Sequence, residues 1–350
     1  MLPMMPQLAR PAERPLVVER LLPPKDPRTG RVVEYATPIE APGGWAWTRH
    51  DGTVLPSGRF VPRTPEAKFE SITHLRHWWY STAITTTHRF DLLTGERRIF
   101  PNLNFPSEVD QVDEDGVPVG FQPARRTKGD RLRLLPYRGY RALALPASYA
   151  RRPDAVEIGL HAAIRGRTIA GTLPTDTSGG VHPRPFLWRR DDLAPRTLPL
   201  PSGYSHGAVR AVNSRGDVVG NVWSKTLAYR VALWPAGGGV RLLPVASTHS
   251  DDHIRDDGDG ARWIAGTVRL ITEDGLVVSQ ERVRLSPYEY ITTLWDGERT
   301  MWLPDAIEGV NAVAFDGLRL SADGRGFVVQ IGQSSASTEA DFGWYRVTPR

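Results

Sequence analysis

Apolar and polar residues alternate along this chain in short runs separated by turn residues. The clearest example is GAVRAVNSRGDVVGNVWS (207–224), in which two alternating runs flank an Asn-Ser-Arg-Gly-Asp turn. The next residues, KTLAYRVALWPAGGGVRLLP (225–244), add two more such runs around a glycine turn. Period-two alternation over four to eight residues is typical of antiparallel strands joined by tight turns. The segment therefore predicts one four-stranded antiparallel sheet.

The same unit recurs along the chain. Its second half, a strand around an aromatic residue, then a turn and often Leu-Pro, returns in FLWRRDDLAPRTLPLP (186–201), TLWDGERTMWLP (293–304) and WAWTRHDGTVLP (45–56). More divergent copies are HRFDLLTGERRIFP (88–101), YRALALP (140–146) and FGWYRVTP (342–349). With one marker residue per copy, the markers are Trp47, Phe90, Leu143, Trp188, Trp234, Trp295 and Tyr345, and the spacings are 43, 53, 45, 46, 61 and 50 residues.

The first half of the unit recurs as well. Copies are VDQVDEDGVPVG (109–120), GLHAAIRGRTIAG (159–171), HIRDDGDGARWIAG (253–266) and AVAFDGLRLSADGRGFVV (312–329). A period of about 45 residues with four short strands is typical of a propeller blade. We therefore predict an all-β chain with a single β-propeller of about seven four-stranded blades. Six blades is the alternative, because the third copy is degenerate.

The domain boundaries follow from the same pattern. Residues 1–14 are expected to form a flexible extension, and 15–350 a single propeller domain. A strand near Val17 and the last strand of the chain are expected to share one closing blade, since this removes open sheet edges.

The repeat resembles that of the HAF-repeat family of bacterial β-propeller-like proteins. The family pattern has an Asn-x-x-Gly turn followed by Val-Val-Gly and then a Phe-Leu-Trp strand, and AVRAVNSRGDVVG (208–220), FLW (186–188) and ALW (232–234) match it. The resemblance covers residues 159–304, and the remaining repeats follow by periodicity. It implies a propeller and no activity.

Composition narrows the function classes. The chain has 350 residues, 40% of them hydrophobic, and no cysteine, which excludes disulfides, thiolate chemistry and cysteine-ligated zinc. Four of the 44 basic residues are lysines. The basic residues alternate with acids instead of clustering, so no nucleic-acid partner is expected. No apolar run is long enough for a leader or a membrane span, which predicts a cytoplasmic protein without a membrane partner.

The residues directly before each innermost strand are the candidates for a site. Loops entering these strands crowd around one mouth of a propeller channel, and concave mouths favour ligands. This slot holds an acid or a histidine in blade after blade, at Glu70, Glu108, Asp154, His206, Asp251, Asp252, His253 and Glu308. Such a ring could bind a divalent cation or perform acid–base chemistry. The alternative is that solvated loops carry acids in any case.

Within this ring, His206 and His253 are the candidate bases and Asp252 their partner, while the other acids are candidate ligand-binding residues. Ser205 is expected not to pair with His206, because neighbours on a strand point to opposite faces. No cofactor or metal is required by any motif, since DDGDG (256–260) lacks the calcium-loop spacing. The stretch THLRHWWYSTAITTTH (73–88) is interpreted as aromatic core packing.

Two functions remain open. The first is a propeller that binds a small molecule, a peptide or a partner protein at one mouth of the channel. The second is an intracellular enzyme of hydrolase, lyase or cyclase type that uses histidine and carboxylate chemistry on a small molecule there.

Overall fold

A computed structural model of the chain describes most of its strands and turns. The described residues are 16–33, 36–63, 72–75, 77–82, 86–101, 108–113, 115–123, 134–149, 158–163, 166–177, 180–189, 194–224, 229–244, 267–285, 288–303, 314–332 and 343–349.

These residues form seven four-stranded antiparallel sheets. In chain order, the first three sheets contain β2 (Thr37–Ala41), β3 (Gly44–Arg49), β4 (Gly52–Val54) and β5 (Phe60–Pro62); β6 (Ile72–Leu75), β7 (Trp78–Thr82), β8 (Thr86–Asp91) and β9 (Arg97–Pro101); and β10 (Glu108–Val112), β11 (Pro118–Pro123), β12 (Leu134–Arg138) and β13 (Arg141–Ala142). The next three contain β14 (Gly159–Ala162), β15 (Thr168–Thr177), β16 (Gly180–Arg189) and β17 (Arg196–Thr197); β18 (His206–Val212), β19 (Val218–Trp223), β20 (Arg230–Trp234) and β21 (Arg241–Leu242); and β22 (Thr267–Ile271), β23 (Val277–Leu285), β24 (Tyr288–Trp295) and β25 (Thr300–Trp302).

The seventh sheet joins the two ends of the chain. It contains β26 (Ala314–Leu320), β27 (Phe327–Gly332), β28 (Gly343–Pro349) and, at its outer edge, β1 (Leu16–Leu21). β1 pairs antiparallel with β28 over its whole length, from Leu16 opposite Pro349 to Leu21 opposite Trp344. The expected pairing of the terminal strands in one sheet is therefore present.

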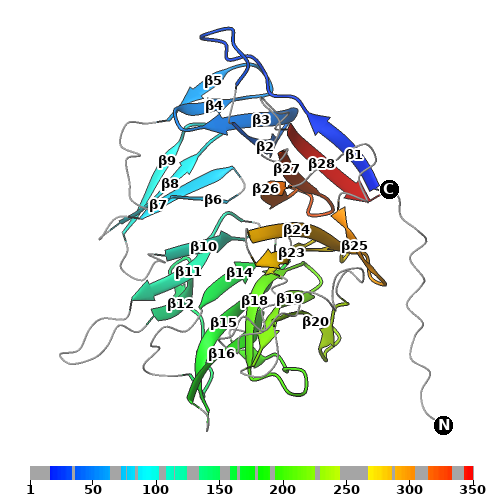
Figure 1. Cartoon of the computed structure of the whole chain (residues 1–350). Coiled ribbons are helices and arrows are strands. Elements are labelled where there is room, and N and C mark those ends of the chain that lie inside the picture. Colours follow the sequence, from blue (N-terminus) through cyan, green and yellow to red (C-terminus); the bar gives the residue numbers. More distant parts are fainter. Residues whose placement is uncertain are drawn as a thin grey trace.

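The sheets are arranged as blades around a common centre (Figure 1). Their first strands lie innermost, and β10 contacts β6 and β14, β18 contacts β14 and β22, and β22 contacts β26. The predicted propeller of four-stranded blades is confirmed, and the sheets number the seven expected.

The hairpin that defines the repeat forms β18 and β19. Its turn is closed by two bonds between the same residues: the Asn213 amide donates to the Asp217 carbonyl (3.1 Å), and the Asp217 amide donates to Asn213 Oδ1 (3.0 Å). Gly216 adopts φ 88°, a conformation that strains any residue with a side chain. Asn and Gly recur in the repeat because this turn needs them.

The glycine that ends the Val-Val-Gly sequence is required for a different reason. Gly220 in β19 lies against the inner strand, where a Cβ would come within 1.9 Å of the Ala208 carbonyl oxygen. Gly171 in β15 occupies the corresponding place, with a Cβ only 2.5 Å from the Leu160 side chain. Close approach of the inner strand therefore selects glycine here.

The repeated tryptophans hold the segment that leads into their own blade. Trp188 and Trp234 are fully buried in the inter-blade core. The Trp188 indole donates to the Ala144 carbonyl (2.9 Å) and the Trp234 indole to the Pro199 carbonyl (2.6 Å). Each buried indole thus fixes a connection and satisfies its own polar group.

Successive blades also interlock through the turns at the far end of their inner strands. The Ser214 amide and hydroxyl both donate to the Glu273 carboxylate of the next blade, the amide at 3.0 Å. The Glu273 amide donates to the Gly324 carbonyl (2.8 Å), and the Ala322 amide donates to Glu40 (2.7 Å). These contacts tie four consecutive blades together around the channel.

Three details of the predicted repeat are wrong. Trp47 lies in the second strand of its blade, β3, and Leu143 follows the fourth strand, β13, whereas the other markers lie in third strands. In the sixth blade the first hairpin of the described sheet is β22–β23, which starts at Thr267, and not the expected stretch 253–266, which lies outside the described residues. In the divergent copies the turn residues are retained, but they connect different strands of the blade.

Candidate functional site

The described residues line a sizeable open cavity at the centre of the propeller. Its volume is about 450 Å³, and its walls come from the inner strands β2, β10, β14, β18, β22 and β26. This volume is typical of ligand pockets. The lining residues belong to the second half of each inner strand, near the interlocked turns. The cavity therefore lies at the opposite end of the inner strands from the predicted ring.

Three neighbouring blades each direct an arginine into this cavity. Arg210 comes from β18, Arg269 from β22 and Arg319 from β26. In β18 and β22 the pairing register shifts at the arginine itself, between Val209 and Ala211 and between Val268 and Leu270. A bulge leaves one residue outside the ladder and turns its side chain away from its regular direction. The bulges explain how a long cation is accommodated in an otherwise apolar inner strand.

The three arginines differ in their partners. Arg269 donates from Nε to Gln280 Oε1 (2.8 Å), and Arg210 also has a partner. Arg319 makes no hydrogen bond or ion pair with any residue that the structure describes, and burial lowers its pKa. Its guanidinium is thus partly desolvated without compensation from a neighbouring carboxylate.

His161 from β14 lies beside this group. Burial and, to a smaller extent, the positive charge of Arg210 together lower the pKa of His161 to about 4, while a hydrogen bond with the Val209 backbone opposes the shift. Its Nδ1 is buried and has no hydrogen-bond partner within the described part of the chain. His161 is therefore a neutral imidazole at pH 7 with one ring nitrogen left for a ligand.

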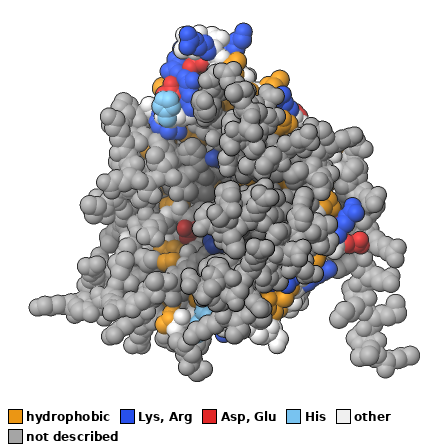
Figure 2. All heavy atoms as spheres, viewed as in Figure 1, with side chains coloured by type: hydrophobic (Ala, Val, Ile, Leu, Met, Phe, Trp, Pro, Cys, Tyr) orange, Lys and Arg blue, Asp and Glu red, His pale blue; other side chains and the backbone are white. Residues whose placement is uncertain are grey.

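The charge of the cavity is predominantly positive. Among the lining residues that the structure describes, three guanidinium groups face one carboxylate, that of Glu40, which accepts the Ala322 amide and lies 3.7 Å from the Arg346 guanidinium. Basic and acidic side chains are visible in the hollow at the centre of the space-filling view (Figure 2). The arrangement suits an anion that several arginines hold together.

One pattern in the sequence points to this cavity, and it lies in the inner strands and not in the turns. An arginine interrupts the apolar inner strand in AVRAVN (208–213), TVRLIT (267–272) and GLRLSA (317–322). Such a residue in the innermost strand of consecutive blades must face the channel or its neighbours. The arginine pattern alone does not indicate at which end of the inner strands the cavity lies.

The predicted ring of acids and histidines lies mostly outside the described residues. This holds for Glu70, Asp154, Asp251, Asp252, His253 and Glu308, whose roles stay predictions. Glu108 is the first residue of β10 and His206 the first residue of β18, so both begin an inner strand as expected. Among the described residues, no group of three or more His, Asp or Glu side chains could hold a metal ion, and the predicted cation stays a prediction.

His206 is part of a hydrogen-bonded chain. Ser205 Oγ lies 2.7 Å from His206 Nδ1, and His206 Nε2 lies 2.7 Å from His182 Nδ1 in β16. The expectation that Ser205 and His206 could not pair is wrong. Ser205 precedes β18 and does not belong to it, so strand alternation does not direct its side chain.

The histidine-rich stretch 73–88 divides between core and cavity. His88 is buried, stacks on Phe90 and accepts a hydrogen bond from Arg97 at Nδ1, as core packing predicts. His77 instead lines the central cavity, with Nε2 4.0 Å from Asp91 Oδ2.

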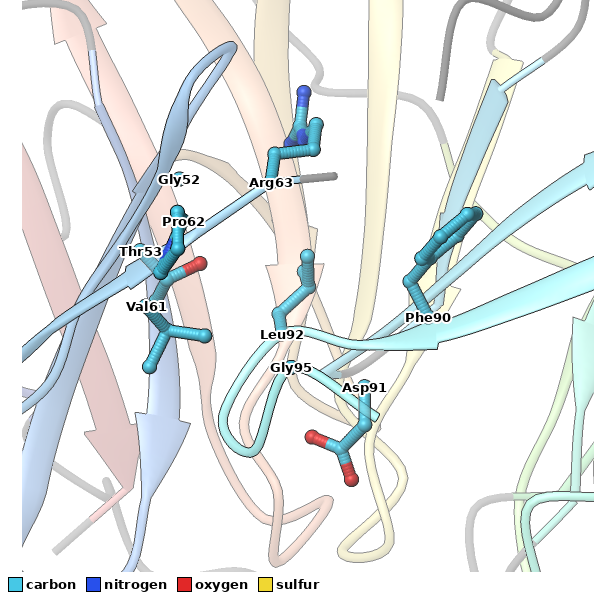
Figure 3. Close-up of a pocket in the computed structure, with 9 residues that line it drawn as sticks. All are labelled: Gly52, Thr53, Val61, Pro62, Arg63, Phe90, Asp91, Leu92 and Gly95. Carbon is cyan, nitrogen blue, oxygen red and sulfur yellow. The ribbon is translucent and has the colours of Figure 1, made fainter. Parts of the chain in front are cut away.

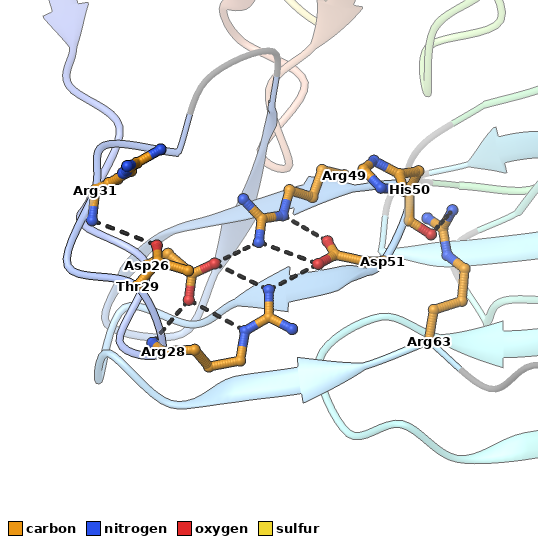
Figure 4. Close-up of polar contacts among 8 residues, drawn as sticks. All are labelled: Asp26, Arg28, Thr29, Arg31, Arg49, His50, Asp51 and Arg63. Carbon is orange, nitrogen blue, oxygen red and sulfur yellow. Dashed lines mark hydrogen bonds and ion pairs between the residues drawn. The ribbon is translucent and has the colours of Figure 1, made fainter.

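Two further polar features lie away from the channel. A small pocket between β5 and the β8–β9 turn, around Val61, Arg63 and Leu92, has a volume of about 20 Å³, enough for one water molecule (Figure 3). Asp26 and Asp51 are joined by Arg28 and Arg49 in a network that fixes the segment after β1 to the β3–β4 turn (Figure 4). Neither feature offers room for an organic ligand.

Comparison with known proteins supports the fold. No family model and no curated protein matches the chain, so the resemblance to HAF repeats stays a prediction. Among solved structures, one from a structural and mechanistic analysis of two prolyl endopeptidases matches with 11% identity and a TM-score of 0.54 over 89% of this chain and 50% of that one. Prolyl oligopeptidase B from Galerina marginata matches with 8% identity and a TM-score of 0.53 over 84% and 46%.

A third similar structure is a β-propeller domain alone. It belongs to the Trilobed protease from Pyrococcus furiosus and matches with 12% identity and a TM-score of 0.46 over 81% of this chain and 87% of that one. The seven four-stranded sheets of the described residues make this chain an all-β propeller. In the described part of the chain no helix is long and apolar enough to cross a membrane.

Proposed function

We propose that this protein is a binding propeller whose central cavity takes a small anionic molecule. The observation that carries this is the convergence of Arg210, Arg269 and Arg319 on one cavity of about 450 Å³, where Glu40 is the one carboxylate among the described lining residues. A carboxylate or phosphate group forms bidentate bonds with guanidinium groups and would supply the partner that Arg319 lacks within the described chain.

The neutral His161 refines the choice of ligand. An anion surrounded only by cations would be selected by charge alone, whereas a neutral imidazole adds a directional hydrogen bond at Nδ1. The ligand therefore combines an acidic group, held by the arginines, with a polar group within reach of His161. Hydroxycarboxylates and phosphorylated small molecules have this combination.

Thermal unfolding in the presence of anions tests the proposal. Inorganic phosphate, succinate and citrate are added at millimolar concentration and constant ionic strength, with chloride as the reference. A ligand of the native state raises the melting temperature in proportion to RT ln(1 + [L]/Kd). We expect at least one of these polyvalent anions to stabilise the protein beyond chloride.

Matched variants locate the effect. Arg319→Met keeps much of the side-chain volume but removes the charge, and should weaken anion binding about tenfold or more, because a hydrogen bond to a charged group contributes about 1.5–3 kcal/mol. Arg141→Met changes an exposed arginine on the outer strand β13 and should leave binding unchanged. Equal behaviour of the two variants, or stabilisation by no anion beyond chloride, would overturn the proposal.

The alternative function, an enzyme with histidine acid–base chemistry, is favoured by one separate observation. The predicted base His206 is hydrogen-bonded to Ser205 and to His182 at the other end of β18. This group is independent of the anion cavity.

A further inference from the structure

The chain of Ser205, His206 and His182 is built by two neighbouring blades. The Ser205 amide donates to the Trp223 carbonyl (3.2 Å), which fixes the serine backbone just before the start of β18. His206 follows as the first residue of β18, directly opposite Trp223. His182 comes from the preceding blade, where β15 and β16 are ten residues long each. Strands of this length exceed the usual five to six or so, and their extension brings His182 to the start of β18.

Stacked rings hold the His206 imidazole in place. The His206 and Trp223 rings stack with centroids 5.4 Å apart and planes at 15°, and Trp223 stacks on Tyr229 at 4.6 Å and 6°. The His182 ring meets His206 edge-on at 4.4 Å. With one face against Trp223 and both nitrogens hydrogen-bonded, His206 has a fixed orientation. Ser205, His206 and His182 are all half-buried and therefore within reach of a solute.

With both imidazoles neutral, two proton arrangements satisfy both hydrogen bonds. In the first, the Ser205 hydroxyl donates to His206 Nδ1, so the His206 proton sits on Nε2 and is donated to His182 Nδ1. In the second, His182 Nδ1 donates to His206 Nε2, and His206 Nδ1 donates to the serine. In the first arrangement the neutral His206 imidazole accepts the serine hydroxyl proton at Nδ1, and the His182 imidazole accepts a hydrogen bond from the other nitrogen of His206. This is the arrangement of a nucleophile, its base and an orienting group.

We propose that Ser205 is a nucleophile for acyl transfer, with His206 as its general base and His182 as a positioning residue. Ser205 Oγ adds to the carbonyl carbon of an ester while its proton passes to His206 Nδ1. The bond between the carbonyl carbon and the leaving oxygen then breaks, and that oxygen takes the proton from His206. Water repeats the two steps on the acyl-serine and releases the carboxylic acid.

The surrounding side chains indicate the ester class. Trp223 and Tyr229 present a stacked aromatic wall beside His206, which suits a flat aromatic group. An aryl ester places its ring against this wall, and its phenolate leaves more readily than an alkoxide. Aryl esters of short carboxylic acids are therefore the substrate class that this group of residues fits.

Covalent labelling of the full chain tests the nucleophile directly. The protein is treated with a fluorophosphonate probe and, separately, with 4-nitrophenyl acetate, and the modified residue is identified by peptide mass spectrometry. We expect one modification per chain, on Ser205, and release of 4-nitrophenolate. The rate should fall at acid pH, because protonation of His206 removes the acceptor of the serine proton.

Variants separate chemistry from structure. Ser205→Ala should abolish labelling, whereas Ser202→Ala, an exposed serine of the same loop, should leave it unchanged. His206→Gln should slow labelling at least about a hundredfold, the usual contribution of a general base. His182→Asn keeps an acceptor near the position of Nδ1 and should retain most of the rate, while His182→Leu should lose about tenfold, with the acid limb of the pH profile altered.

The result on the unmodified protein decides the matter even if a variant fails to fold. Labelling elsewhere, or none above that of a heat-unfolded sample, would overturn the assignment of Ser205. Equal rates for His182→Asn and His182→Leu, with unchanged pH profiles, would show that His182 has no positioning role. The anion cavity lies at the other end of the inner strands, so neither outcome bears on it.

Discussion

Leu21 in β1 lies directly opposite Trp344 in β28, so the first described strand of the chain completes the sheet formed by its last strands. Leu21 is 3% exposed and packs with Trp344 and Trp47 in one core cluster between the closing blade and the first blade. The ring is closed by this packing as well as by the strand pairing.

Truncation at this position should therefore destabilise the whole propeller. Leu21→Ala should lower the free energy of unfolding by about 2–5 kcal/mol, because it removes buried methyl groups and leaves a cavity. Leu22→Ala is the control, since Leu22 is 72% exposed and its loss should change stability by less than about 0.5 kcal/mol. Urea unfolding of both variants measures the difference. Equal stabilities would mean that β1 does not close the ring.

The interlocked turns should stabilise the ring as well. Glu273 accepts hydrogen bonds from Ser214 of the preceding blade, and Glu273→Ala leaves these donors without their acceptor. The expected loss is about 1–3 kcal/mol. Glu298→Ala, an exposed glutamate on the β24–β25 turn, is the matched control in the same urea experiment. A double-mutant cycle with Ser214→Ala should recover as coupling the share of the loss that the Ser214 hydroxyl contributes, since the backbone amide of residue 214 remains a donor in this variant. Fully additive losses would contradict the contact between the hydroxyl and Glu273.

Asp26 should make stability depend on acid pH. Hydrogen bonds from Arg28 and Arg49 hold the pKa of Asp26 well below its ordinary value. For Asp51, burial raises the pKa, but hydrogen bonds from the same two arginines outweigh burial and lower the pKa to about 2. A carboxyl with a lowered folded-state pKa stabilises the fold above its unfolded value of about 3.9 and loses this contribution as pH falls toward the folded value.

Asp26→Asn should accordingly lower the melting temperature at pH 7, and its difference from the unmodified protein should shrink between about pH 4 and pH 2. Asp274→Asn changes an exposed aspartate and should show no such pH-dependent difference. Melting curves from pH 7 to pH 2 measure both. A constant difference across this range would exclude the ion pairs as its cause.

His161 should produce a pH dependence in a different window. Its folded-state pKa of about 4 lies below the unfolded value of about 6.5, so the folded chain resists protonation where the unfolded chain does not. Stability is complete above about pH 6.5 and is lost progressively as pH falls to 4. His161→Gln should remove this part of the loss, whereas His50→Gln, at an exposed position, should not. Superimposable pH profiles of the two variants would contradict burial of His161.

The fold could be predicted from the sequence at positions where a single local requirement, such as a turn, a close approach of strands or a core contact, determines the residue type. Asn213 and Gly216 close a turn, Gly220 permits close approach of the inner strand, and Trp188 fills the core and fixes a connection. These requirements act within one blade and recur in the next. Where copies diverge, as at Trp47, the same residues occupy a different strand, and pattern alone gives the wrong position.

The candidate sites depend on relationships that alternation does not encode. The bulge at Arg210 reorients a side chain within a strand, and the bond between Ser205 and His206 joins a loop residue to a strand residue. The approach of His182 to His206 depends on the length of a hairpin in another blade. The sequence indicates His206 as a candidate, but strand alternation wrongly argues against Ser205 as its partner, and the contact with His182 arises only when two blades pack together.

Arg319 should reduce stability in the absence of a ligand. Burial lowers its pKa, and no residue in the described part of the chain pairs with it, so the fold holds a desolvated cation without compensation. Arg319→Met should therefore raise the melting temperature of the ligand-free protein by about 1–2 °C, while it removes stabilisation by anions. Binding sites commonly reduce stability in this way. Arg141→Met should change neither quantity, and a lower melting temperature for Arg319→Met in anion-free buffer would mean that the guanidinium stabilises the fold.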